Sequence, residues 1–122
     1  MKQFTSKTQK IGEIGEDEAV VFLIKQRYEI VERNIANKYG EIDIVAKKSG
    51  IYHFFEVKTG YQGSWFNPAE NLTEAKIRKL RISVDHYCFM RNIEKYEIAG
   101  VIVLLPVVSG AKPLIEVFSL VY

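Results

Sequence analysis

The spacing of hydrophobic residues predicts one helix over about residues 10–26 and a second over about residues 73–90. In the first, the apolar positions fall on one helical face: Ala19, Val20 and Leu23. In the second, which Thr73 can cap, apolar positions recur at the same interval: Ile77, Leu80, Val84, Tyr87 and Cys88. Each helix is therefore expected to pack along one face.

Alternating and continuous apolar runs predict five strands. They cover residues 28–35, 40–46, 51–58, 96–105 and 114–121. The run 96–105 is apolar almost throughout, which is typical of a central strand buried on both faces. A right-handed crossover through the second helix would make this strand parallel to one of the first three. The pattern predicts an α/β fold of order αβββαββ, with a mixed central sheet of about five strands flanked by helices.

Two neighbouring strands carry the candidate chemistry. Alternation predicts that Ile42 and Ile44 share one face of their strand and that Asp43 lies on the other. In the next strand, Glu56 and Lys58 share a face. If these strands pair antiparallel, Asp43 lies beside Glu56, so two carboxylates and an ammonium group converge. Such a set suits Mg²⁺, which takes oxygen ligands and is held by one or two carboxylates plus substrate phosphate. The implied chemistry is phosphodiester hydrolysis.

A Glu-x-Lys triplet alone is a weak signal. About one is expected by chance at this composition, and a second occurs at Glu74-Ala75-Lys76. The aromatic-rich strand before Glu56 and the aspartate on the preceding strand favour the first triplet. The alternative is a half-exposed strand with a cross-strand ion pair, worth about a few tenths of a kcal/mol.

The first helix carries a carboxylate where a hydrophobic residue is expected. Glu16 falls on its packing face, where charged residues are normally avoided. Gly12 and Gly15 share that face, and each costs about 1 kcal/mol of helix stability relative to alanine. The pair predicts a close approach to other backbone. The alternative is a helix that starts after Gly15, with Glu16 favoured by the helix dipole.

Basic residues crowd the first two turns of the second helix: Lys76, Arg78, Lys79 and Arg81. They oppose the helix dipole there unless phosphate binds. The expected loop over residues 59–72 carries Tyr61, Trp65 and Phe66, which could stack on unpaired bases. The alternatives are a solvated basic face and aromatic residues that cover the core or a subunit interface.

Composition limits the number of domains, the location of the protein and its disulfides. The 122 residues, 48% hydrophobic and 26% charged, predict one globular domain over residues 1–122, with residues 1–9 as a frayed tail. No apolar run suits a membrane span or a secretory signal, so no membrane partner and a cytoplasmic location are expected. The single cysteine excludes an internal disulfide. A net charge of +2 does not by itself indicate nucleic acid.

The chain also carries short motifs in a fixed order. These are Gly12-x-x-Gly15-Glu16-x-x-Ala19, Arg33-Asn34, GEIDIVA from Gly40, FFEVK ending at Lys58, Asn67-Pro68-Ala69-Glu70 and Thr73-x-x-Lys76. In this order they resemble the YraN family of uncharacterised endonuclease-like proteins, over about residues 10–90. The resemblance implies a restriction endonuclease-like fold of the PD-(D/E)xK group, which includes Holliday junction resolvases.

The resemblance also implies roles for individual residues. Asp43 and Glu56 match metal-binding carboxylates, and the Val57 carbonyl would be a further ligand. Glu16 matches a helix glutamate that joins the metal site in resolvase-like members. Lys58 matches the lysine that orients the attacking water or stabilises the charge of the transition state.

Outside this set, Lys76 matches a basic residue that contacts phosphate, and Glu41 belongs to the family signature without an assigned role. Two positions depart from the family pattern. Gly60 stands where members usually carry a basic residue, and so does Ala36. Both departures remove positive charge near the expected site.

The expected function is Mg²⁺- or Mn²⁺-dependent hydrolysis of phosphodiester bonds in DNA, with branched or structured DNA among the expected substrates. The alternatives are a non-catalytic nucleic-acid-binding module of the same fold and a protein-interaction domain. Nucleases that cut both strands of a duplex often act as symmetric dimers, so a homodimer is expected by analogy.

Overall fold

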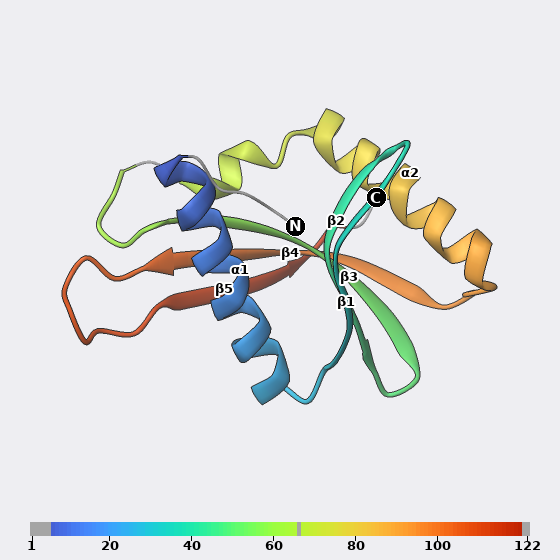
Figure 1. Ribbon diagram of the computed structural model, residues 1–122, viewed down its shortest axis with the longest axis horizontal. Helices are drawn as coiled ribbons and strands as arrows, with labels where there is room; N and C mark the ends of the chain where they lie inside the picture. The colour runs from blue at the N-terminus through green and yellow to red at the C-terminus, as the bar shows by residue number, and fades with distance from the viewer. Residues whose placement is uncertain (1–5, 66, 121–122) are drawn as a thin grey trace.

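The computed structural model describes residues 6–65 and 67–120 and has a five-stranded sheet with a helix on either face (Figure 1). The elements are α1 Lys7–Lys25, β1 Glu29–Asn37, β2 Gly40–Lys48, β3 Ile51–Tyr61, the 3-10 helix η1 Pro68–Asn71, α2 Glu74–Arg91, β4 Tyr96–Leu105 and β5 Leu114–Ser119. The predicted mixed α/β fold and its order αβββαββ are confirmed.

The strands lie in the sequence order β1-β2-β3-β4-β5. Neighbours pair antiparallel except β3 and β4, which pair parallel, with Glu56 opposite Gly100. The chain needs a crossover between two parallel neighbours, and α2 supplies it. β4 lies inside the sheet, between β3 and β5. Most of its residues are buried, as predicted for this strand.

Two adjacent residues of β3 build the two halves of the core. Successive strand residues point to opposite faces, and Phe55 packs with Ala19 and Leu23 of α1. Phe54 packs with Leu80 of α2 in a separate cluster. The helices therefore cover opposite faces of the sheet, and β3 lies between both of them.

The alternation of β2 is interrupted at the candidate site. Ile44 belongs to the cluster on the α1 face, whereas Ile42 belongs with Val45 to the cluster on the α2 face. The prediction that Ile42 and Ile44 share a face is therefore wrong. Asp43 lies at the point where the side-chain pattern shifts.

The physical reason lies in the backbone on both sides of Asp43. The ladder between β2 and β3 ends at the pair Ile44 and Phe55. Beyond it, the N–H of Val57 donates to the side chain of Asp43. On the other side, in β1, Asn34 has a left-handed φ of 53°, which a regular strand does not contain.

Several further boundaries differ from the expectations. Helix α1 begins at Lys7, where Ser6 caps it by accepting a hydrogen bond from the Gln9 N–H. The expected frayed tail is therefore wrong for residues 7–9, and residues 1–5 lie outside the described part. The alternative of a helix that starts after Gly15 is also wrong. Strand β5 ends at Ser119.

Strand β3 continues past Lys58 to Tyr61, so the expected loop does not start at residue 59. The last three residues of β3 complete the parallel ladder with β4. Gly60 lies in this extension, and a Cβ there would come within 3.2 Å of the buried Pro68 ring. Close packing accounts for glycine at this position.

Neither helix of the described residues combines the length and apolar character needed to cross a membrane.

The two glycines of α1 should respond in opposite directions to substitution by alanine. A Cβ on Gly15 would lie 2.7 Å from the Thr59 Cβ of β3, whereas a Cβ on Gly12 meets nothing within 4 Å. We expect Gly15→Ala to lower the free energy of unfolding by about 1–3 kcal/mol. Gly12→Ala should raise it by up to about 1 kcal/mol, because alanine favours the helix. Urea denaturation measures both, and equal changes would contradict the close contact between α1 and β3.

Candidate metal and phosphate site

A hollow of about 460 Å³ lies beside α1, β1, β2 and β3. Six of its lining residues are acidic and two are basic: Glu13, Glu16, Asp17, Glu41, Asp43 and Glu56, with Arg33 and Lys58. We call it the acidic hollow. It brings together all the residues for which sequence predicted a catalytic or metal-binding role: Glu16, Asp43, Glu56, Val57 and Lys58. The excess of carboxylates makes it a place where a cation would be attracted.

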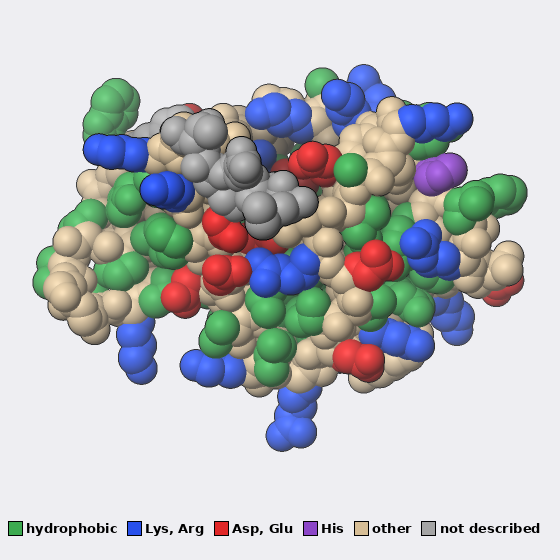
Figure 2. All heavy atoms as spheres, in the orientation of Figure 1, with side chains coloured by type: hydrophobic (Ala, Val, Ile, Leu, Met, Phe, Trp, Pro, Cys, Tyr) green, Lys and Arg blue, Asp and Glu red, His purple; other side chains and the backbone are tan. Residues whose placement is uncertain are grey.

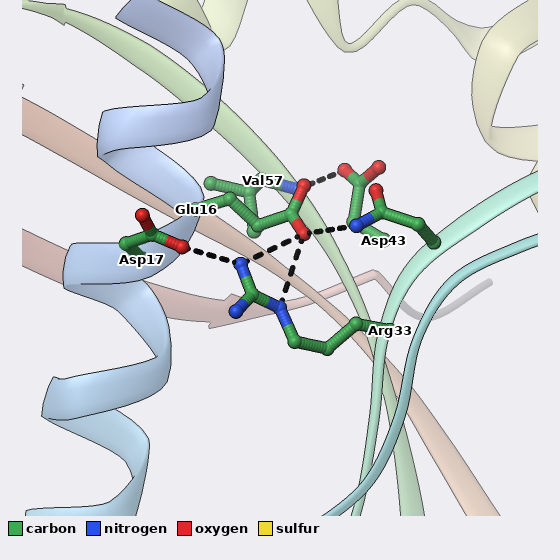
Figure 3. Close-up of polar contacts among 6 residues, drawn as sticks. Glu16, Asp17, Arg33, Asp43 and Val57 are labelled. Carbon is green, nitrogen blue, oxygen red and sulfur yellow. Dashed lines mark hydrogen bonds and ion pairs between the residues drawn. The ribbon is translucent and has the colours of Figure 1, made fainter. Parts of the chain in front are cut away.

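Asp43 is held by the backbone of the neighbouring strand. Its Oδ2 accepts a hydrogen bond of 2.8 Å from the N–H of Val57 (Figure 3). This bond orients the carboxylate toward the strand that carries Glu56. The Val57 carbonyl as a metal ligand stays a prediction.

Both carboxyl groups resist ionisation in this position. Burial, followed by the negative charge of Glu56, raises the pKa of Asp43 to about 7, with a smaller contribution from Glu16 and against the opposing effects of the Val57 hydrogen bond and Lys58. Burial also raises the pKa of Glu56, against the opposing effect of Lys58. The positive charge near Asp43 and Glu56 is too small to neutralise both carboxylates. A bound cation would therefore relieve their mutual repulsion.

Lys58 is the cation closest to this pair among the contacts described. Its Nζ lies 3.4 Å from Glu56 Oε1, and both side chains are about one quarter exposed or less. The ion pair runs along β3 and does not cross to β2. The ammonium group is therefore within reach of whatever binds at Glu56.

Glu16 is buried, and its charge is compensated by β1. Its Oε1 accepts hydrogen bonds from Arg33 Nε and Nη2, at 3.3 and 3.2 Å, and from Asn34 Nδ2 at 2.9 Å (Figure 3). The same Arg33 Nη2 donates to Asp17 at 2.7 Å. The ion pair explains how a glutamate is tolerated on the packing face of α1. Whether Glu16 also binds metal stays a prediction.

The residues fit a metal ion that keeps most of its water. No group of three or more His, Cys, Asp or Glu side chains among the described residues is arranged to hold a metal ion by itself. Asp43 and Glu56 by themselves would leave most positions around such an ion to other oxygen atoms, and their role as ligands stays a prediction. Mg²⁺ is commonly held by one or two carboxylates, with water and phosphate completing its shell.

Glu41 lies in the acidic hollow and is exposed. Its charge contributes to the raised pKa of Glu56. Glu41 therefore acts on Glu56 electrostatically, by making its ionisation less favourable.

The four basic residues in the first two turns of α2 do not form one patch. Lys76 and Lys79 line a second hollow together with Asp43 and Glu56. Arg78 and Arg81 line a different one, on another side of the helix. Figure 2 shows several Lys and Arg side chains along α2, at the upper right of the view, and Asp and Glu side chains nearer its centre. Only the two lysines are placed to act with the carboxylates.

Trp65 is fully exposed, so it does not cover the core, and it lines none of the hollows around the carboxylates. Its stacking on bases stays a prediction, as does its burial in a subunit interface. Tyr61 ends β3 and is exposed, and Phe66 lies outside the described residues.

The sequence did not predict the roles of Arg33 and Asn34. The Arg33-Asn34 pair stood out as a motif, but nothing in the sequence linked it to Glu16. The left-handed φ of Asn34 carries no sequence signal beyond the tolerance of asparagine for that region.

The comparisons with known proteins agree with one another. The model of the family described as "Uncharacterised protein family UPF0102" matches residues 15–103. A "UPF0102 protein" of a Nitratiruptor species is 38% identical over 98 residues, covering 80% of this chain and 85% of that protein. One of Aliarcobacter butzleri is 42% identical over 95 residues, covering 76% and 84%. One of Helicobacter hepaticus is 45% identical over 82 residues, covering 67% and 72%. The chain belongs to the UPF0102 family.

Proposed function

We propose that the protein is a Mg²⁺- or Mn²⁺-dependent nuclease that hydrolyses phosphodiester bonds in DNA, branched DNA included. The observation that carries this proposal is the pair Asp43 and Glu56. Both have raised pKa values, both line one hollow, and Lys58 lies 3.4 Å from Glu56. The αβββαββ order also agrees with the restriction endonuclease-like fold that the sequence motifs imply.

In this proposal Asp43, Glu56 and the Val57 carbonyl would hold the metal ion. When bound, the ion would neutralise phosphate charge and lower the pKa of a water molecule. The Val57 N–H keeps the Asp43 carboxylate in place through its hydrogen bond. The acidic hollow is open enough for solvent and one phosphate group, with a volume of about 460 Å³.

Lys58 has the position of an electrostatic catalyst. Its ammonium group pairs with Glu56 before substrate binds. It can then donate a hydrogen bond to the attacking water or to a phosphate oxygen that gains charge in the transition state. Lys76 and Lys79 approach the same carboxylates from α2 and would hold the neighbouring phosphate backbone.

Loss of either carboxylate should abolish cleavage. With radiolabelled duplex, single-stranded and four-way-junction DNA, we expect cleavage in Mg²⁺ or Mn²⁺ and none in EDTA. Asp43→Asn and Glu56→Gln should each lower the rate at least about 100-fold, and Lys58→Gln by a similar factor. Arg78→Gln is the matched control, because it removes a charge from the other hollow. Cleavage that persists in EDTA or survives both carboxylate changes would refute the proposal.

Stability should depend on pH through Asp43. Its pKa is about 7 in the folded protein and 3.8 ordinarily, so between these values the folded state binds a proton that the unfolded chain has lost. The contribution of Asp43 to the free energy of unfolding is fully present below pH 3.8 and is lost as the pH rises through 7. Asp43→Asn should therefore be more stable than wild type at about pH 8, by about 2–4 kcal/mol. The difference should shrink toward about pH 4.

Metal provides the second arm of that experiment. Added Mg²⁺ should stabilise the wild type at about pH 8 and leave Asp43→Asn unchanged, because the ion binds only the folded carboxylates. Urea denaturation at about pH 4, 6 and 8, with and without Mg²⁺, measures both effects. Parallel pH profiles for the two proteins would show that Asp43 titrates normally.

A non-catalytic nucleic-acid-binding module is the second candidate, favoured by the fully exposed Trp65 and by the basic side chains of α2. On this alternative DNA binds in EDTA, no substrate is cut, and log affinity falls linearly with log salt. Neutralising Lys76, Arg78, Lys79 and Arg81 together should then flatten the salt dependence. Binding that is unchanged in this variant would count against the module.

A further inference from the structure

A second hollow, of about 280 Å³, lies between β2 and α2. Asp43 and Glu56 line it as well as the acidic hollow. The two hollows therefore meet at the carboxylate pair, one on the side of α1 and one on the side of α2. We call the second one the β2–α2 hollow.

The β2–α2 hollow contains a buried hydroxyl group with no partner. Ser83 is fully buried, and its Oγ makes no hydrogen bond within the described protein. Such groups are rare in folded proteins, because a hydroxyl loses its hydration on burial. The hydroxyl oxygen is itself buried, and Ser83 lines the hollow, so a rotation of its side chain is needed to present the hydroxyl to a ligand there.

Gly40 keeps the space beside this hydroxyl open. Gly40 also lines the hollow, and a Cβ at this position would lie 3.0 Å from Ser83 Oγ. A larger residue at position 40 would crowd the hydroxyl. Glycine at position 40 therefore avoids a close contact with the unpartnered hydroxyl.

The remaining walls of the hollow combine apolar surface with positive charge and with a third carboxylate, that of Glu41. Leu72, Ile77 and Leu80 supply the apolar part, and Lys76 and Lys79 supply the charge. A sugar and a base have apolar faces with polar edges, and a phosphate carries the negative charge that lysines bind. A hollow of about 280 Å³ suits one such unit and not several.

We propose that the β2–α2 hollow binds the sugar and base of one nucleotide, with its phosphate at Lys76 and Lys79 and its polar edge at the Ser83 hydroxyl. This inference deepens the proposed function, on which it rests for the position of the reacting phosphate. A nucleotide seated there would direct the next phosphodiester bond to Asp43 and Glu56. The hollow would thereby fix which bond in a strand reaches the carboxylates.

The test uses single nucleotides without metal, so that it does not depend on cleavage. The full chain is titrated in EDTA with each deoxynucleoside 5′-monophosphate and with inorganic phosphate. Nuclear magnetic resonance locates binding, and calorimetry gives the affinity. We expect the amide signals of Gly40, Leu80 and Ser83 to shift, and at least one nucleotide to bind about tenfold or more tightly than phosphate.

Variants assign the contacts. Ser83→Ala should weaken nucleotide binding about three- to tenfold without lowering the thermal midpoint, because the hydroxyl has no protein partner to lose among the described residues. Lys76→Gln with Lys79→Gln should weaken it about tenfold or more. Arg78→Gln with Arg81→Gln is the matched control on the same helix, and its affinity should stay within about twofold of wild type.

Three results would overturn the inference. They are equal binding of nucleotide and phosphate, an unchanged affinity in Ser83→Ala, and an equal loss in the arginine control. Failure of the proposed function would look different, because cleavage and the Mg²⁺ effect on stability would be missing while nucleotide binding in EDTA persisted.

Discussion

The hydrogen bond from the Val57 N–H to Asp43 is the contact on which the candidate site depends. In a regular antiparallel pair this N–H would face a backbone carbonyl of β2. Here a side chain takes that place, and the ladder between β2 and β3 ends at Ile44 and Phe55. The sheet loses regular pairing at this end and gains a fixed carboxylate. Strand ends that diverge in this way leave room for a ligand between them.

The electrostatic balance of the site follows from what surrounds that carboxylate. Burial raises the pKa of Asp43, and Glu56 and Glu16 are close enough to raise it as well. Glu16 is matched by Arg33, and Glu56 by Lys58. Within the described part of the chain, the hydrogen bond that holds Asp43 comes from a neutral N–H donor. The unbalanced charge is therefore concentrated on the carboxylate that lies where the two hollows meet.

The sequence predicted the element order and the meeting of Asp43 with Glu56, because both follow from strand periodicity and an antiparallel turn. It could not predict that Ile42 faces α2. That shift depends on the interruption at Asp43, which no pattern of apolar residues records. The length of β3 was missed for a related reason. Gly60 indicates a loop in isolation, but pairing with β4 and packing under Pro68 hold it in a strand.

The adjacency of Phe54 and Phe55 ties the two faces of the molecule to one strand. If α1 or α2 detached, one of these aromatic rings would be exposed, and β3 would lose half of its cover. Partial opening is therefore costly, and the amides of β3 and β4 should exchange with solvent only through global unfolding. Because β3 also carries Glu56 and Lys58, the most slowly exchanging part of the protein and the candidate chemistry share a single segment. The site is thus built on the strand that both helices cover.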